Sequence, residues 1–212
     1  MRNTMKLALA SLAAALLLAS IVSAASAAHL SSTERTFRAV WTPLTFAESF
    51  GFFNVRCNVT MEGSFVERTI AKVVGSVIGD VTSAGVAHPC TGGEGWAWNG
   101  RESILGVVQS TSLPWHLTYE GFTTTLPNIA TIRLLLVRPK FSISTAVCLS
   151  TYQPANLNAT ANRNTTTGTI RLTPNGESQE QLSGNCGAGA FTGESGTATG
   201  AGNATAISVS LI

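Results

Sequence analysis

The segment Phe53–Met61 reads FNVRCNVTM, and it decides the fold class. Apolar side chains occupy every second position, from Phe53 through Cys57 to Met61, and polar side chains lie between them. Because side chains alternate between the two faces of a β-strand, this spacing places five apolar groups on one face. A helix would distribute the same residues around its circumference. The segment therefore predicts a strand buried on one face, in an antiparallel sheet.

Short alternating patterns recur along the rest of the chain and are separated by turn residues. A first strand is expected to end at Pro43, because proline cannot donate to the hydrogen-bond ladder. Ala130–Ile143 is apolar on both faces, which predicts a central strand covered from both sides. We predict a mainly β protein of about nine to ten short strands, either an antiparallel β-sandwich or a small β-barrel.

Val66–Ala84 departs from this pattern. Ile70, Val74 and Ile78 recur every four residues, with small and polar residues in parallel stripes. Such stripes are typical of a mostly buried helix packed on a sheet. The β-branched residues and two glycines disfavour a helix, and a strand with Val73, Val77 and Val81 on one face is the alternative. We expect one helix over about residues 66–84, packed on a sheet.

The first 28 residues have the three regions of a secretory signal peptide. Arg2 and Lys6 supply positive charge, Leu7–Val22 is apolar, and Ser23–Ala28 contains only small residues. We predict cleavage after residue 27 or 28. An N-terminal membrane anchor is the alternative, and it is disfavoured because 16 apolar residues are few for a span of about 20.

Residues 29–212 are then expected to form one secreted, extracytoplasmic domain. Removing Arg2 and Lys6 leaves eleven basic and eleven acidic side chains, so this domain is neutral. That balance does not predict binding to nucleic acid. No second long apolar run follows, so we expect no stable membrane insertion after cleavage.

Four cysteines remain in this domain, and an even number in an exported protein predicts two disulfides. Three pairings are open in principle. We predict Cys57–Cys90 and Cys148–Cys186, because each bridge joins neighbours in the sequence and requires no threading of the chain. Each should contribute on the order of 3–4 kcal/mol by restricting the unfolded chain.

Two fragments, around His88 and around Ser195, resemble the His and G-D-S-G segments of chymotrypsin-type serine proteases. In that family the acid of the triad lies between the His and the Ser in the chain. The only aspartate here, Asp80, precedes His88, and Thr197 replaces the second glycine of G-D-S-G-G. The sequence therefore favours a turn histidine and a serine in a glycine-rich loop, and we predict no catalytic residue.

The remaining histidines and carboxylates form no recognisable metal motif. His29, His88 and His116 are far apart in the sequence, and the cysteines are expected to be bridged. His116 falls on the polar face of a predicted strand, where a solvated or hydrogen-bonded imidazole is expected. No spacing among the ten glutamates marks a glycosidase pair. We predict neither a metal nor another cofactor.

Trp96 and Trp98 are the candidate ligand-binding residues. Two positions apart on a predicted strand, they face the same way and could form the aromatic platform on which sugars stack. Packing of both rings in the core is the alternative, and we favour it. Asn-X-Thr glycosylation sequons begin at Asn58, Asn158, Asn164 and Asn203, although a chain rich in Asn and Thr produces them by chance.

Three functions follow from these residues. The first is a secreted, non-enzymatic domain with a binding or structural role and an unknown ligand, for which a carbohydrate or a cell-surface ligand is a candidate. The second is an exported hydrolase of undetermined mechanism, and the third is a carbohydrate-binding module that uses Trp96 and Trp98. We favour the first, because the usual catalytic residue types are scarce and lie apart in the sequence.

Overall fold

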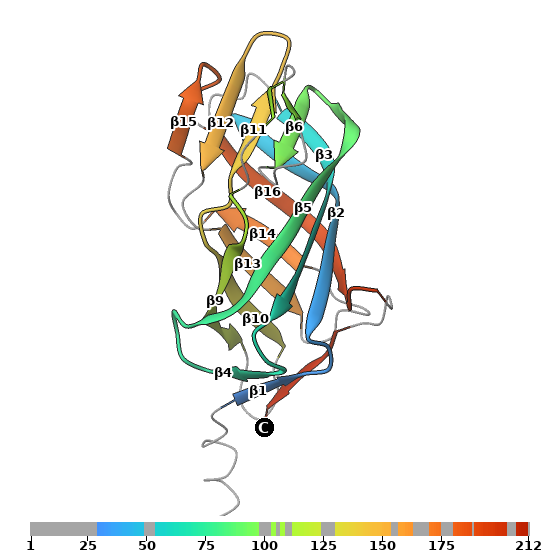
Figure 1. Cartoon of the computed structure of the whole chain (residues 1–212), viewed down its shortest axis with the longest axis vertical. Coiled ribbons are helices and arrows are strands. Elements are labelled where there is room, and N and C mark those ends of the chain that lie inside the picture. The colour runs from blue at the N-terminus through green and yellow to red at the C-terminus, as the bar shows by residue number, and fades with distance from the viewer. Residues whose placement is uncertain are drawn as a thin grey trace, which may run out of the picture.

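Eight strands of this protein, in a computed structural model, close into an antiparallel barrel with the strand order β10-β13-β14-β16-β2-β3-β5-β9 (Figure 1). The pairing of β10 with β9 completes the circle. The structure describes residues 29–48, 54–97, 103–104, 107–108, 112–123, 130–153, 157–162, 170–174, 180–187, 189–202 and 207–211. The barrel strands are β2 (Thr36–Glu48), β3 (Asn54–Phe65), β5 (Val77–Thr91), β9 (Trp115–Thr123), β10 (Thr131–Leu136), β13 (Leu157–Asn162), β14 (Ile170–Pro174) and β16 (Gly189–Thr199).

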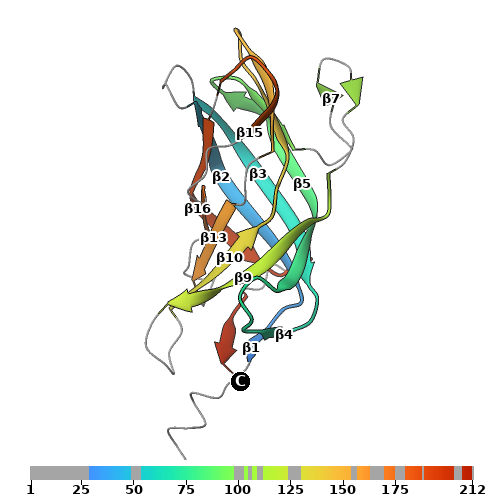
Figure 2. The ribbon, with the colours of Figure 1, turned by 90° about the vertical axis from the view of Figure 1, so that its left-hand side faces the viewer.

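A small sheet lies at each end of the barrel (Figures 1 and 2). The three-stranded sheet at the lower end contains β17 (Val209–Leu211), β1 (His29–Ser32) and β4 (Thr69–Ala71). The four-stranded sheet at the upper end contains β15 (Glu180–Gly184), β12 (Leu149–Gln153), β11 (Phe141–Ser144) and β6 (Glu94–Ala97). A separate hairpin joins β7 (Ser103–Ile104) to β8 (Val107–Val108).

Apolar side chains join both end sheets to the barrel. At the lower end, Leu30 pairs with Ile70, and both are buried. At the upper end, the ring of Phe46 on β2 lies 4.7 Å from Tyr152 on β12, and Trp115 on β9 lies 5.2 Å from Phe141 on β11, measured between ring centroids. Burial of such aromatic side chains contributes on the order of a few kcal/mol each, so the end sheets share the core of the barrel.

The strand predicted from FNVRCNVTM is confirmed. In β3, Val55, Cys57, Val59 and Met61 are buried, whereas Asn54, Arg56 and Asn58 between them are exposed. The strand pairs antiparallel with β2 on one side and with β5 on the other, so it is central in the sheet. Phe53, the first residue of the predicted pattern, lies outside the described residues.

The helix predicted over residues 66–84 is wrong. This segment, all of which is described, forms β4, a turn and the first part of β5. The i, i+4 pattern misled because Ile70 and Ile78 are buried in two different strands, whereas Val74 lies in the turn and is exposed. A bulge in the pairing of β5 with β9, between Val77 and Gly79, also breaks the simple strand alternation.

Other parts of the predicted architecture are corrected as well. The mainly β, antiparallel class is confirmed, but the β-sandwich is not, because the eight strands curl into one closed sheet. The described residues form seventeen strands rather than nine or ten. β2 continues through Pro43, where its register shifts, and the expected long strand over residues 130–143 is divided between β10 and β11.

Both disulfides are formed with the predicted partners. Cys57–Cys90 links the neighbouring strands β3 and β5, and Cys148–Cys186 links the start of β12 to the chain that follows β15. The first bridge therefore lies in the wall of the barrel near the upper sheet, and the second lies within the upper sheet region. Among the described residues no cysteine is free.

Residues 1–28, the predicted signal peptide, lie outside the described residues, and so do Trp98, Asn164 and Asn203. Asn58 is exposed on β3, and Asn158 lies in β13. In the part of the chain that the structure describes, no helix has the length and hydrophobicity that crossing a bilayer requires.

Candidate functional site

His116 and Asp80 form a pair on the outer wall of the barrel. Asp80 on β5 lies opposite His116 on β9, and its Oδ1 atom is 2.6 Å from the imidazole Nδ1. The His116 side chain is 54% exposed. A carboxylate at Nδ1 orients the ring and leaves Nε2 as the nitrogen that could act as a base or ligand. This is the geometry of the acid–histidine half of a catalytic triad.

The strand register keeps Ser64, the serine opposite Asp80, away from His116. Ser64 on β3 lies opposite Asp80, so the order across the sheet is Ser64, Asp80, His116. Strands in a sheet are spaced by about 4.8 Å, so roughly 10 Å separates Ser64 from His116. A nucleophilic serine must donate its hydrogen bond to the histidine, and here the aspartate lies between them.

A second histidine–carboxylate pair lies near the upper end of the barrel. His88 Nδ1 on β5 is 2.6 Å from Oε2 of Glu94 on β6, and the Cys90 N–H donates to the same oxygen over 3.4 Å. The candidate ligand atoms of these three residues lie within 4.8 Å of one another. The Cys90 sulfur is bonded to Cys57, so it is not a thiolate, and only two effective metal ligands remain. The pair instead connects the end of β5 to β6.

Ser195 and His88 are not brought together by sheet pairing. Ser195 lies in β16, whereas His88 lies in β5, and β2 and β3 lie between these strands in the barrel. The chymotrypsin-like fragments are thus separate segments of different strands. Trp96 lies in β6, opposite Ser142, and its partner Trp98 is outside the described residues, so the aromatic platform stays a prediction.

A small apolar cavity lies between the barrel and the upper sheet. Phe46, Cys57 and Phe141 are among its lining residues, and its volume is about 20 Å³. A cavity of this size holds at most about one water molecule, and an apolar cavity usually stays dry. It is a packing void rather than a site for an organic ligand.

Two titratable groups are shifted by burial. Desolvation raises the pKa of Tyr119 on β9 above its usual value of 10.0, and the positive charge of Arg133 opposes this shift in part. Desolvation also lowers the pKa of Lys140, which lies between β10 and β11. Tyr119 lies three residues from His116 on β9, but its side chain is buried whereas that of His116 is exposed. Lys140 belongs to neither histidine–carboxylate pair, and neither shift marks a reactive centre.

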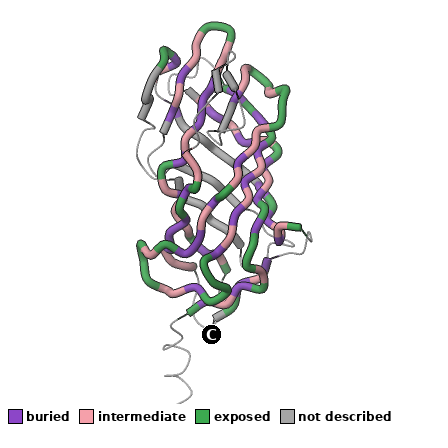
Figure 3. Tube along the Cα trace, in the orientation of Figure 1, coloured by how far each residue is buried: buried purple, intermediate pink, exposed green. Residues whose placement is uncertain are grey.

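The most unusual surface lies at the lower end of the molecule, and we name it the valine end. Large apolar side chains that are more than half exposed are rare in the described residues, and four of the five occur between the end of β3 and the start of β5. They are Val66, Val73, Val74 and Val77. Figure 3 shows the connection between β4 and β5 as an exposed segment at the lower left. Scattered apolar residues on a surface need no explanation. Val73 and Val74, however, are adjacent in one turn and Val77 follows at the start of β5, and such a concentration favours a contact surface.

The turn that carries these valines is firmly held. Val74 and Gly75 form its centre, with the Ser76 N–H donating to the Val73 carbonyl over 3.0 Å, and Gly75 has a φ of +80°. This is a type II turn, which requires glycine at its third position. The Gly75 N–H donates to the Tyr119 carbonyl (2.8 Å), and the Tyr119 N–H donates to the Ser76 carbonyl (3.0 Å). The valines are thus presented by a fixed backbone.

Sequence reasoning missed the valine end because it placed these residues in a helix. Val74-Gly75 followed by Ser76 was the signal for a turn, and three valines around a turn are unusual because connections are mostly polar. Comparison of the chain with protein families, with curated proteins and with solved structures finds no match.

Proposed function

We propose that this protein is an exported, non-enzymatic binding domain that uses the valine end as its contact surface. The observation that carries the proposal is the exposure of Val73 and Val74, which are 61% and 67% exposed on a hydrogen-bonded turn. Leaving such groups in water costs free energy, whereas covering them with a partner recovers it.

Three further features support a role outside the cytoplasm. The two disulfides suit an oxidising compartment. The basic, apolar and small-residue regions of residues 1–28 have the order of a signal peptide. β1 begins at His29, so cleavage after residue 27 or 28 leaves every described strand intact.

The distribution of the protein between producing cells and medium tests this proposal. We expect a cell-associated fraction of wild type that falls severalfold in a Val73→Ser/Val74→Ser variant. Val147→Ser is the matched control, because Val147 is 81% exposed but lies on the connection between β11 and β12 in the upper sheet. N-terminal sequencing of both fractions reports cleavage. Equal distribution of all three proteins would contradict the proposal.

The two alternatives are tested separately. A hydrolase would depend on His116, which is the more exposed of the two carboxylate-paired histidines, so His116→Ala should abolish any activity found in a screen of esterase, protease and glycosidase substrates. A carbohydrate-binding module would depend on Trp96 and Trp98, so oligosaccharides should shield the fluorescence of these residues from iodide. We expect neither effect.

A further inference from the structure

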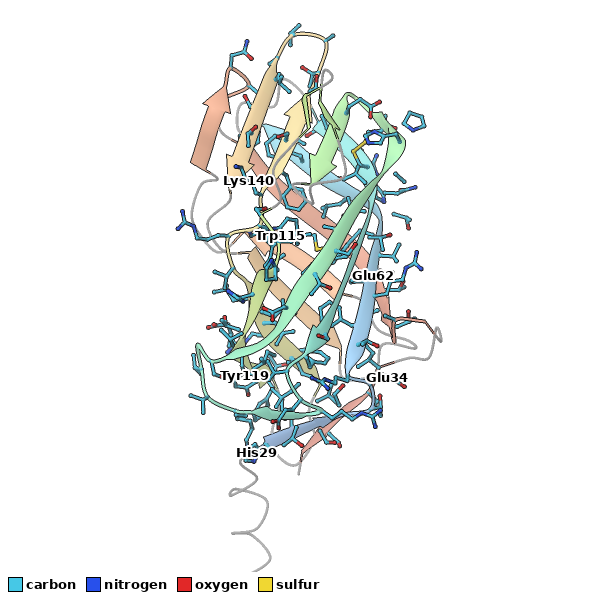
Figure 4. The ribbon with its side chains drawn as sticks, viewed as in Figure 1. His29, Glu34, Glu62, Trp115, Tyr119 and Lys140 are labelled. Atoms are coloured by element: carbon cyan, nitrogen blue, oxygen red, sulfur yellow. A yellow bond between two sulfur atoms is a disulfide. The ribbon has the colours of Figure 1, made fainter. Side chains whose placement is uncertain are left out.

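We infer that the partner of the valine end is a lipid bilayer, an inference that rests on the proposed function of this surface. The first reason is its place in the chain. His29, the first residue of β1, lies directly opposite Ala71, the last residue of β4, and Lys72 and Val73 follow at once. Figure 4 shows His29 and Tyr119 at the same end of the molecule as β4. Val73 is therefore two residues from the position that pairs with His29, the residue that follows residues 1–28 in the sequence.

The second reason is the reach of that segment. Leu7–Val22 is the longest apolar run of the sequence, and a bilayer is the environment that it requires while the chain is exported. Only residues 23–28 separate it from β1, and an extended chain of six residues spans at most about 22 Å. Before the predicted cleavage after residue 27 or 28, a chain whose residues 7–22 lie in a bilayer thus holds the valine end near the membrane surface. After cleavage, the exposed valines and the cations near them must make the contact alone.

The third reason is the chemistry around the valines. Arg68 and Lys72 flank β4, and no acidic residue occurs from Arg68 to Gly79. The Lys72 ammonium lies 5.9 Å from the centre of the Phe122 ring, within the range of a cation–π contact, and the residue is partly buried. Exposed valines with cations nearby in the sequence suit the boundary between acyl chains and phosphate headgroups, although Glu120, which follows Tyr119, adds a negative charge. Glu67 beside Arg68 limits the net positive charge, so the contact should depend more on burial of valine than on anionic lipid.

The fourth reason is that docking requires little rearrangement. The turn is already fixed by its hydrogen bonds to Tyr119, so no backbone must be ordered when Val73 and Val74 enter the interface. Two or three valines give a shallow and reversible contact rather than a membrane span.

Quenching by brominated lipids tests this inference at the residue itself. The full-length Val74→Trp variant is mixed with vesicles of phosphatidylcholine and phosphatidylglycerol, with and without bromine on the acyl chains. Full-length Val147→Trp is the matched control, and wild type gives the background of the four native tryptophans. Because residues 7–22 are the same in every variant, differences between the variants report the substituted position.

We expect brominated vesicles to quench the added fluorescence of Val74→Trp by about twofold, because its ring would lie at the acyl boundary, and to leave that of Val147→Trp unchanged. Val73→Trp serves as a second reporter on the same turn. Equal quenching at positions 74 and 147, or quenching at neither, would overturn the bilayer as partner. If quenching is absent but Val73→Ser/Val74→Ser still releases the protein from cells, only the lipid inference fails. If both effects are absent, the proposed binding surface fails too.

Discussion

At the scale of single residues, aromatic rings that lie against glycines fill part of the barrel. Trp41 on β2 lies opposite Gly196 on β16, and Phe37 on β2 lies opposite Gly63 on β3. A Cβ atom added to Gly196 would lie 2.6 Å from the Trp41 ring, and one added to Gly63 would lie 2.7 Å from Phe37. The rings occupy the space that side chains at these glycines would take, which is a known way to protect glycine in a sheet.

Gly196→Ala should therefore destabilise the barrel by about 1–3 kcal/mol, the usual cost of overpacking a dense core. Gly85→Ala on β5 is the matched control, because a Cβ atom there meets nothing within 4 Å. Urea unfolding of the two variants measures the difference. Equal stability of both would show that Trp41 does not rest on Gly196.

Tyr119 gives the fold a dependence on alkaline pH. Its pKa in the folded protein is raised above 10.0, mainly by burial, so the unfolded chain releases the phenol proton first as pH rises. Stability should be independent of this group below about pH 10 and should fall as pH rises from there through the folded pKa. Absorbance titration should show one phenol ionising later than in the unfolded chain. In the Tyr119→Phe variant, the late phenol ionisation should be absent. The part of the alkaline loss of stability that this ionisation causes should be absent too.

At the scale of elements, the local pattern of apolar residues correctly predicted strands that are buried on one face. The same pattern gave a wrong prediction where the chain changes direction. β3 was predictable because its alternation is unbroken from Val55 to Met61. The segment that contains β4 and β5 was not, because its buried residues belong to two strands and a bulge shifts the face of Val77. Such bulges and turns are set by pairing with distant strands, and a local window does not contain that information.

The disulfides connect elements that the sheet already makes neighbours. The Cα atoms are 4.6 Å apart in Cys57–Cys90 and 5.0 Å apart in Cys148–Cys186. Each bridge closes a loop of similar length, with sequence separations of 33 and 38, so similar contributions are expected. The pairing of sequence neighbours was predictable from loop length, since it required no knowledge of the barrel.

Replacing either cysteine pair by two alanines should lower the free energy of unfolding by on the order of 3–4 kcal/mol, because the unfolded chain regains loop entropy. Guanidinium unfolding of the Cys57→Ala/Cys90→Ala and Cys148→Ala/Cys186→Ala variants measures both losses. A loss under about 1 kcal/mol for either pair would mean that the bridge adds little beyond the sheet hydrogen bonds.

At the scale of the whole molecule, the β class was predictable and the closure of the barrel was not. Closure depends on the pairing of β9 with β10 and on the pairing of β16 with β2. The second pairing joins the last barrel strand in the sequence to the first. The pair of Asp80 and His116 was not predictable from the sequence for a related reason. Asp80 and His116 are 36 residues apart, and only the register of β5 with β9 brings them together. The valine end likewise was not predictable from the sequence, because it depends on Val74 and Gly75 forming a turn between β4 and β5.

For the whole protein, we propose that the valine end is the surface that meets a partner outside the cytoplasm. Photo-crosslinking in producing cells tests this most directly, with a photoreactive amino acid placed at position 74 or, as the control, at position 147. Both positions are exposed, so they differ in location rather than accessibility. We predict abundant adducts from position 74 and few from position 147. Adducts at equal yield from both positions, or none from position 74, would contradict the claim.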